Sequence, residues 1–227
     1  MSDAATAMNQ SRGDASAAPD FDAAFRQRLH DLLVWRRDIR HFRTDPLPPG
    51  TLERLIGIAC LAPSVGLSQP WRFVIVDDAA RRAAVRDNFS ACNAEALASY
   101  AGDRAQHYAT LKLEGLREAP GHLAVFAERA TTVGHGVGRR TMPEMADYSV
   151  VAAISTLWLA DRAEGIGVGW VSIVDPAKIA ATLDVPADWR LIGYFCIGYP
   201  QTESDSPELE RIGWEQRRPV ADHIVRR

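Results

Sequence analysis

The chain has 227 residues, and its 26 basic and 29 acidic side chains give a net charge of −3 with neutral histidines. This balance argues against nonspecific binding of nucleic acid or an anionic membrane by the whole surface. Apolar residues make up 47% of the chain and charged residues 24%, which excludes wholesale disorder. The length predicts one large domain, or one domain with appendages, whose core needs no disulfide or metal.

Cysteine usage and hydropathy indicate the cellular compartment in which the protein is expected. The three cysteines, Cys60, Cys92 and Cys196, lie far apart and form no C-x-x-C pair, which favours a reducing compartment. Residues 1–20 lack the apolar core of a secretory signal, and the longest apolar stretch is shorter than the ~20 residues of a membrane span. We therefore expect a cytoplasmic protein that does not span a membrane.

The N-terminal part of the chain changes from a low-complexity segment to helices. Residues 1–20 have no hydrophobic period and are expected to be disordered. Apolar residues recur at three- and four-residue steps in 21–35, and again in 51–60 after a proline-rich break, so both stretches predict helices. The proline, glycine and serine content of residues 62–71 predicts a loop.

The remaining pattern predicts four strands and further helices. In chain order we expect a strand at 73–76, helices at 79–100 and 103–117, a strand at 122–128, a loop at 131–143, a helix at 145–162, a strand at 167–173, a helix at 175–183 and a strand at 191–197. The helix at 145–162 is apolar nearly all round and is expected to be fully buried. Since strands and helices do not alternate one to one, the order favours an α+β layer arrangement.

Several common catalytic motifs are absent from the sequence. There is no H-E-x-x-H, no G-x-S-x-G and no P-loop. The glycine clusters at 134–138 and 165–169 lack the spacing or the strand–turn–helix context of a dinucleotide-binding fold. The second cluster is more simply a helix end followed by close backbone packing. No metal site and no dedicated nicotinamide-binding unit are expected.

The first positive signal is a cluster of charges at residues 36–43, which hold four arginines and Asp38. Guanidinium groups match phosphate oxygens, so the cluster can anchor a phosphate, although such runs often point to water. The arginines are expected to lower the pKa of Asp38. Its carboxylate is either the partner in an internal ion pair or a base beside an anionic ligand.

Two further segments carry polar groups in constrained settings. In loop 62–71, Gly66 permits close approach, and the side chains of Ser64 and Gln69 can hydrogen-bond the edge of a polar ring. An ordinary helix-to-strand connector has a similar composition. Ser172, near the end of a predicted strand, is either a ligand contact or a hydroxyl that is merely satisfied by the backbone.

Taken in order, these segments resemble the nitroreductase-like FMN flavoproteins. Residues 36–42 are similar to the motif R-R-x-x-R-x-F, residues 62–73 to A-P-S-x-x-x-x-Q-P-W-x-F, and residues 165–170 and 197–200 to a glycine-containing strand and a G-Y-P turn. The resemblance covers about residues 25–200. It implies a mostly antiparallel sheet of four or five strands flanked by helices, and a homodimer that binds FMN between its subunits.

The resemblance also implies a domain organisation. Residues 1–20 precede an FMN domain at 21–200, which includes a helical lid at about 79–117. Residues 201–227 form a C-terminal dimer-exchange arm that packs on the partner subunit. This arm is polar but keeps the apolar residues Leu209, Ile212 and Trp214. Its arginines that could reach a phosphate are Arg211, Arg217 and Arg218, among which the sequence does not choose.

Within the superfamily, the chain is similar to the enzymes that make 5,6-dimethylbenzimidazole, the lower ligand of vitamin B12. This resemblance rests on two polar residues, Asp38 and Ser172, and on two stretches of sequence, residues 64–68 and the lid residues 111–120. It implies oxygen-dependent fragmentation of reduced FMN to 5,6-dimethylbenzimidazole and D-erythrose 4-phosphate, in cobalamin biosynthesis. A separate NAD(P)H-dependent flavin reductase would supply reduced FMN.

The same resemblance implies roles for individual residues. Asp38 and Ser172 would carry the proton transfers of fragmentation, as a carboxylate within hydrogen-bond reach can act as a general base. Arginines of the 36–40 segment would hold the phosphate and ring edge, while Ser64 and Gly66 would line the flavin and the O2 site. The FMN-binding residues implied are Arg36, Arg37, Asp38, Ile39, Arg40, Pro63, Ser64, Gly66, Leu67 and Ser172.

Two other functions stay open at this point. One is an FMN-dependent NAD(P)H nitroreductase or dehalogenase that recycles its flavin; Asp38 and Ser172 argue against it, because each is a polar group that a recycling enzyme does not require. The other is a non-catalytic FMN carrier, or a protein that docks a phosphorylated partner on residues 36–43. That alternative leaves loop 62–71 unexplained.

Overall fold

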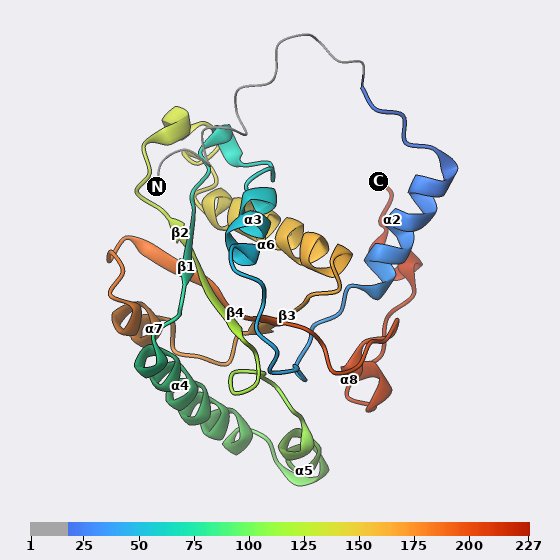
Figure 1. Ribbon diagram of the computed structural model, residues 1–227, viewed down its shortest axis with the longest axis vertical. Coiled ribbons are helices and arrows are strands. Elements are labelled where there is room, and N and C mark those ends of the chain that lie inside the picture. Colours follow the sequence, from blue (N-terminus) through green and yellow to red (C-terminus); the bar gives the residue numbers. More distant parts are fainter. Residues whose placement is uncertain (1–17) are drawn as a thin grey trace. The chain divides into compact units, whose positions relative to one another are not determined.

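An antiparallel sheet of four strands lies at the centre of the computed structural model, which describes residues 18–227 (Figure 1). The strands are β1 (Trp71–Ile75), β2 (Gly121–Glu128), β3 (Gly167–Val171) and β4 (Trp189–Gly198). Their order in the sheet is β1-β2-β4-β3, and each neighbouring pair is antiparallel. The expected α+β fold class is confirmed, and the four expected strands are present with shifted ends.

The N-terminal residues are described only in part. Residues 1–17, most of the segment expected to be disordered, lie outside the described residues. Of the described residues, 18–31 belong to one unit and 32–227 to a second, separate unit. Across the described residues, no helix has the length and hydropathy that would let it span a bilayer.

The helices agree with the sequence pattern in most places. They are α2 (Ala23–Trp35), α3 (Thr51–Ala59), α4 (Ala79–Ala98), α5 (Gly102–Thr110), α6 (Met145–Ala163), α7 (Pro176–Leu183) and α8 (Glu208–Arg211), with 3-10 turns η1 (Val65–Leu67), η2 (Val133–Gly136) and η3 (Val220–His223). The expected helix at 103–117 is wrong beyond Thr110. The backbone becomes extended at Leu111, and the following segment packs Gly115 against the ring of Phe42, where a Cβ would collide.

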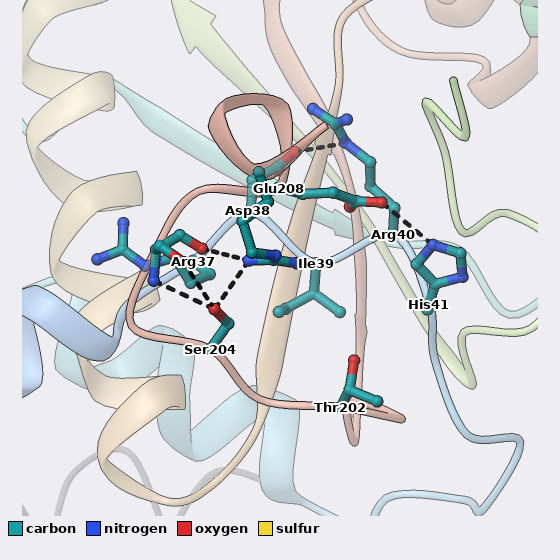
Figure 2. Close-up of a pocket in the computed structure, with 10 residues that line it drawn as sticks. Arg37, Asp38, Ile39, Arg40, His41, Thr202, Ser204 and Glu208 are labelled. Atoms are coloured by element: carbon teal, nitrogen blue, oxygen red, sulfur yellow. Dashed lines mark hydrogen bonds and ion pairs between the residues drawn. The ribbon is translucent and has the colours of Figure 1, made fainter. Parts of the chain in front are cut away.

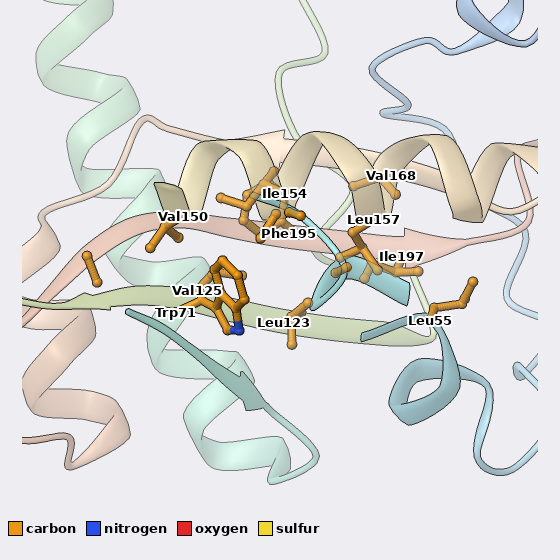
Figure 3. Packing of buried hydrophobic residues seen from close by; sticks show 14 of the residues in the cluster. Leu55, Trp71, Leu123, Val125, Val150, Ile154, Leu157, Val168, Phe195 and Ile197 are labelled. Atoms are coloured by element: carbon orange, nitrogen blue, oxygen red, sulfur yellow. The ribbon is translucent and has the colours of Figure 1, made fainter. Parts of the chain in front are cut away.

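The sheet separates two apolar clusters because side chains alternate along its strands. In β2, Leu123, Val125 and Ala127 belong to the cluster under α3 and α6, whereas Ala124 and Phe126 face the cluster under α4 and α7. Figure 3 shows the first cluster between α6 and the strands. This alternation makes β2 buried on both faces, as its continuous apolar run predicts.

Helix α6 is central but not fully buried, so that expectation is wrong. Val150, Ala153, Ile154 and Leu157 face the sheet and are buried. On other sides of the helix, Tyr148 is 53% exposed and Val151 38%. The helix is apolar nearly all round, yet only one side is covered in this single chain.

Candidate functional site

The arginine-containing segment runs along the outer edge of β3. Asp38 forms a parallel bridge with Val168, and the Ile39 amide donates to the Val168 carbonyl at 3.0 Å. The two backbones approach closely because β3 is rich in glycine: a Cβ on Gly169 would collide with the Ile39 carbonyl oxygen. Fully buried Phe42 anchors the end of the segment. Close packing therefore accounts for the glycines of β3, as the sequence predicts.

The carboxylate of Asp38 is held by two donors. Its Oδ1 accepts from the Trp170 backbone N–H at 2.9 Å. Its Oδ2 accepts from Arg40 Nε at 3.1 Å, as Figure 2 shows. Burial raises the pKa of Asp38 above its usual value, although both hydrogen bonds and the charges of Arg40 and Arg36 oppose the shift. The expected lowering of this pKa is therefore wrong: desolvation against β3 outweighs the arginines.

The four arginines of the cluster have different environments. Arg36 lies over the ring of Trp158, with its guanidinium carbon 5.0 Å from the ring centroid. Arg37 has a buried Nε without a hydrogen-bond partner. The Arg40 side chain is only 12% exposed and also donates from Nη1 to a backbone carbonyl at 3.3 Å. Arg43 is exposed and pairs with Asp45, so it is outside the site.

Two adjoining cavities of about 170 and 240 Å³ lie between this segment and the C-terminal residues 202–217. The first is lined by Arg37, Asp38, Ile39, Arg40, His41, Thr202, Ser204, Ser206, Glu208 and Arg211, and the second by Arg36, Arg37, Asp38, Arg40, Pro207, Glu208, Leu209 and Arg217. Both are cationic and rich in hydrogen-bonding groups. The structure thus brings together the predicted residues of the 36–40 segment around one space.

The C-terminal arginines differ in their availability to a ligand. Arg211 already donates to the Ser204 hydroxyl at 2.8 Å and to the Ser206 carbonyl at 2.5 Å. Arg217 shares a cavity with Arg37, whose pKa is lowered by burial, by the charge of Arg36 and by the charge of Arg217. Arg217 is therefore the better placed of the three C-terminal arginines, since Arg218 lines neither cavity.

The predicted loop residues lie elsewhere in the chain. The Val65 amide donates to Ser149 near the start of α6, whereas the Arg37 carbonyl accepts from Trp158, nine residues later. At 1.5 Å per residue these points are about 13 Å apart along the helix. The predicted loop residues that line neither cavity are Pro63, Ser64, Gly66 and Leu67. Within one chain, therefore, the 36–40 segment and the 62–71 loop do not line the same cavity.

The local geometry of the loop explains its residue types. The Ser64 hydroxyl accepts from the Gln69 amide at 3.1 Å, so it stabilises the turn. Gly66 has a φ of 57° and packs against the η2 turn, where a Cβ would lie 3.0 Å from the Gly134 carbonyl oxygen. Leu67 is 72% exposed. The loop is held by these local contacts and presents an apolar side chain to its surroundings.

Ser172 lies just beyond the end of β3, because the strand expected at 167–173 ends at Val171. It is two residues past Trp170, the backbone partner of Asp38, and its side chain is exposed. Two residues of extended chain span about 7 Å. Ser172 therefore follows directly on the strand that contacts Asp38, but it lines neither cavity.

Sequence reasoning missed the polar residues of the C-terminal wall. Thr202, Ser204, Ser206 and Glu208 line the first cavity, and Glu208 contacts His41 at 3.3 Å. The available signal was the retention of Leu209, Ile212 and Trp214 in a polar tail. Trp214 indeed packs in an aromatic group with His107 and Tyr108 of α5 and with Tyr100, which lies just before that helix. The extension up to this residue contacts its own chain.

Within residues 18–227, no group of three or more His, Cys, Asp and Glu side chains could hold a metal ion. The side chains that line the cavities supply guanidinium groups, hydroxyls, the imidazole of His41 and the carboxylates of Asp38 and Glu208. Such a set can bind an anion and exchange a proton beside it.

Comparisons with known proteins identify the family to which the chain is similar. The family described as "Nitroreductase family" matches residues 33–199. A Rhodospirillum rubrum protein named 5,6-dimethylbenzimidazole synthase is 58% identical over 92% of this chain and 98% of that protein; a Rhodobacter capsulatus protein of the same name is 46% identical over 88% and 97%. A crystal structure of oxidized iodotyrosine deiodinase bound to FMN and 3-iodo-L-tyrosine has a TM-score of 0.66 at 26% identity, covering 78% of this chain and 91% of that one.

Proposed function

This chain belongs to the nitroreductase family, and from that premise we propose that it is a 5,6-dimethylbenzimidazole synthase. Reduced FMN and O2 are its substrates; 5,6-dimethylbenzimidazole and D-erythrose 4-phosphate are two of its products, and the remaining pyrimidine carbons and nitrogens of the flavin leave as a third fragment. The 58% identity to a relative of that name supports this reaction. The observation that carries the proposal is the partly buried Asp38 carboxylate, which faces a cationic cavity at the edge of β3.

The residues around the second cavity fit the phosphate of FMN. Arg36, Arg37 and Arg217 place three guanidinium groups together, and the buried Nε of Arg37 has no hydrogen-bond partner. Burial, together with repulsion by the charges of Arg36 and Arg217, lowers the pKa of Arg37. A phosphate would relieve that repulsion and accept bidentate hydrogen bonds. We therefore assign these three arginines to the phosphate, with Arg217 as the C-terminal contributor.

Asp38 is the general base of the proposed reaction. Fragmentation requires removal of a proton from the ribityl carbon next to the flavin ring, and a fixed carboxylate within hydrogen-bond reach can accept it. The Trp170 amide and Arg40 orient the carboxylate, and burial raises its pKa, which makes it a stronger base than an exposed aspartate. Ser172, exposed beyond β3, is the proposed second proton carrier and a contact of the ring.

We propose a homodimer in which the 63–67 loop of one subunit completes the site formed by residues 36–40 of the other. Support comes from apolar side chains that this chain leaves uncovered around the loop. Leu67, Val137, Tyr148 and Val151 are 38 to 72% exposed on η1, the end of η2 and α6, which contact one another. Contiguous exposed apolar surface of this kind is typical of a subunit interface.

Other parts of the proposal concern the periphery of the site. We propose that residues of the 201–227 extension beyond Trp214 pack on the partner, since Val220, Ile224 and Val225 are well exposed. Residues 79–117 act as the lid that excludes water. A separate NAD(P)H-dependent flavin reductase supplies reduced FMN, because the chain has no dinucleotide-binding motif, and both proteins act in the cytoplasm.

A single-turnover experiment tests the reaction. The protein is loaded anaerobically with reduced FMN, air is admitted, and the products are separated by chromatography. We expect one equivalent each of 5,6-dimethylbenzimidazole and D-erythrose 4-phosphate, with loss of the flavin. Recovery of intact oxidised FMN would instead identify a nitroreductase or dehalogenase that recycles its flavin, and would overturn the proposal.

A further inference from the structure

We propose that Arg40 is a positioning residue that orients the Asp38 carboxylate and couples it to the lid segment 111–118. The inference deepens the proposed function and rests on it. In this arrangement Arg40 does not bind the phosphate. It holds Asp38 in its working orientation while the lid segment is in place.

The guanidinium of Arg40 has two acceptors on different parts of the chain. Its Nε donates to Asp38 Oδ2 at 3.1 Å, and its Nη1 donates to the Lys112 carbonyl at 3.3 Å. A planar guanidinium presents its donors in a fixed fork, so the position of one acceptor constrains the other. Because the side chain is only 12% exposed, water replaces a lost acceptor poorly. Displacement of Lys112 therefore disturbs the hydrogen bond to Asp38.

The lid segment packs closely against residues 40–42. Gly115 lies against the ring of Phe42, and a Cβ at this position would also come within 3.3 Å of the Arg40 carbonyl oxygen. Within the segment, Lys112 pairs with Glu118 at 2.9 Å. The segment thus forms a compact turn that contacts both the side chain and the backbone of Arg40.

Arg43 provides an internal comparison within the same motif. It also donates from Nε to an aspartate two residues away, Asp45, at 2.8 Å. Its side chain is 55% exposed, and it lines neither cavity. The two arginines share a local ion-pair geometry, so burial and the contact with the lid segment distinguish Arg40.

The charge of Arg40 also acts on the titration of Asp38. Arg40 and Arg36 lower the pKa of Asp38 against the effect of burial, so loss of Arg40 raises that pKa further. The other charged groups that share the two cavities are Arg37, His41, Glu208, Arg211 and Arg217. If Asp38 must be ionised, the acidic limb of the rate–pH profile moves to higher pH when Arg40 is removed.

The test compares Arg40→Met, Arg40→Lys and the control Arg43→Met in the full chain. Amide hydrogen exchange of residues 111–118, measured without flavin, should become faster in both Arg40 variants and stay unchanged in Arg43→Met. In single turnovers, Arg40→Met should form product about tenfold more slowly at neutral pH, with its acidic limb moved upward. Arg40→Lys keeps the charge, so its acidic limb should stay near that of the wild type.

Affinity for oxidised FMN separates this role from phosphate binding. The dissociation constant of Arg40→Met should remain within about threefold of the wild type, whereas that of Arg37→Met should rise about tenfold or more. Unchanged exchange in 111–118, an unmoved acidic limb in Arg40→Met, or an affinity loss as large as that of Arg37→Met would each overturn the inference. Failure of the proposed reaction itself would be seen separately, as intact flavin from the wild type.

Discussion

The arginine segment 36–43 and the loop 62–71 carry equally specific motifs, but they have different surroundings in the folded chain. The first segment is held along β3 and meets the C-terminal wall within the same chain. The second is anchored at the start of α6, about 13 Å along that helix from the contact with Arg37, and exposes Leu67. Two motifs in one chain therefore need not form one site in that chain. The difference points to a site shared between two copies.

The largest expected effect lies in the arginine segment. Asp38→Asn removes the general base but keeps the size of the side chain, so FMN should still bind while formation of 5,6-dimethylbenzimidazole falls about a hundredfold or more. Product chromatography after one aerobic turnover measures the loss. Asp45→Asn is the matched control, because Asp45 has a similar arginine partner but is exposed. An unchanged yield in Asp38→Asn would remove Asp38 from the mechanism.

A charge on the exposed side of α6 tests the second region. Tyr148→Glu places a carboxylate on the proposed interface and should shift the protein to a monomer, with FMN affinity reduced about tenfold or more. Sedimentation and flavin titration measure the two effects. Ala177→Glu, on the exposed start of α7, adds the same charge far from that surface and should change neither quantity. A monomeric wild-type protein with full FMN affinity would contradict the shared site.

Mixed dimers test directly whether the two motifs act across subunits. Asp38→Asn and Gly66→Val are each expected to inactivate the homodimer, the latter because φ is 57° and the η2 turn lies against the glycine. In a random mixture, half of the dimers contain both variants and have one intact site of two, so about a quarter of wild-type activity should return. If both motifs served the same subunit's site, mixing would restore nothing.

The smallest expected effect concerns how closely the arginine segment approaches β3. Gly169→Ala places a methyl group against the Ile39 carbonyl and should lower the free energy of unfolding by about 1–3 kcal/mol, while also weakening FMN binding. Gly57→Ala, in α3 with nothing near its added Cβ, should be neutral or stabilising by up to about 1 kcal/mol. Denaturant unfolding measures both. Equal stability of the two variants would show that the contact is not tight.

Most elements could be predicted because their signals are local. The alternation in β2 and the three- and four-residue periodicity of α3 follow from the chain's own side chains. Errors arose where a distant contact decided the outcome. The helix expected at 103–117 ends early at Thr110, and the following turn packs on Phe42, which is remote in sequence. The exposed side of α6 carries apolar residues, so its composition suggested burial that a single chain does not provide.

By itself, the sequence determined the family, the strand order along the chain and the residues of the 36–40 cluster, because these depend on residue types at short spacings. Only the tertiary structure decided which arginines face the cavities, that Arg217 joins them, and that burial raises rather than lowers the pKa of Asp38. Each of these outcomes depends on how closely segments distant in sequence approach one another. Solvent exclusion and Coulomb interactions follow from that separation in space, which no local pattern of residues encodes.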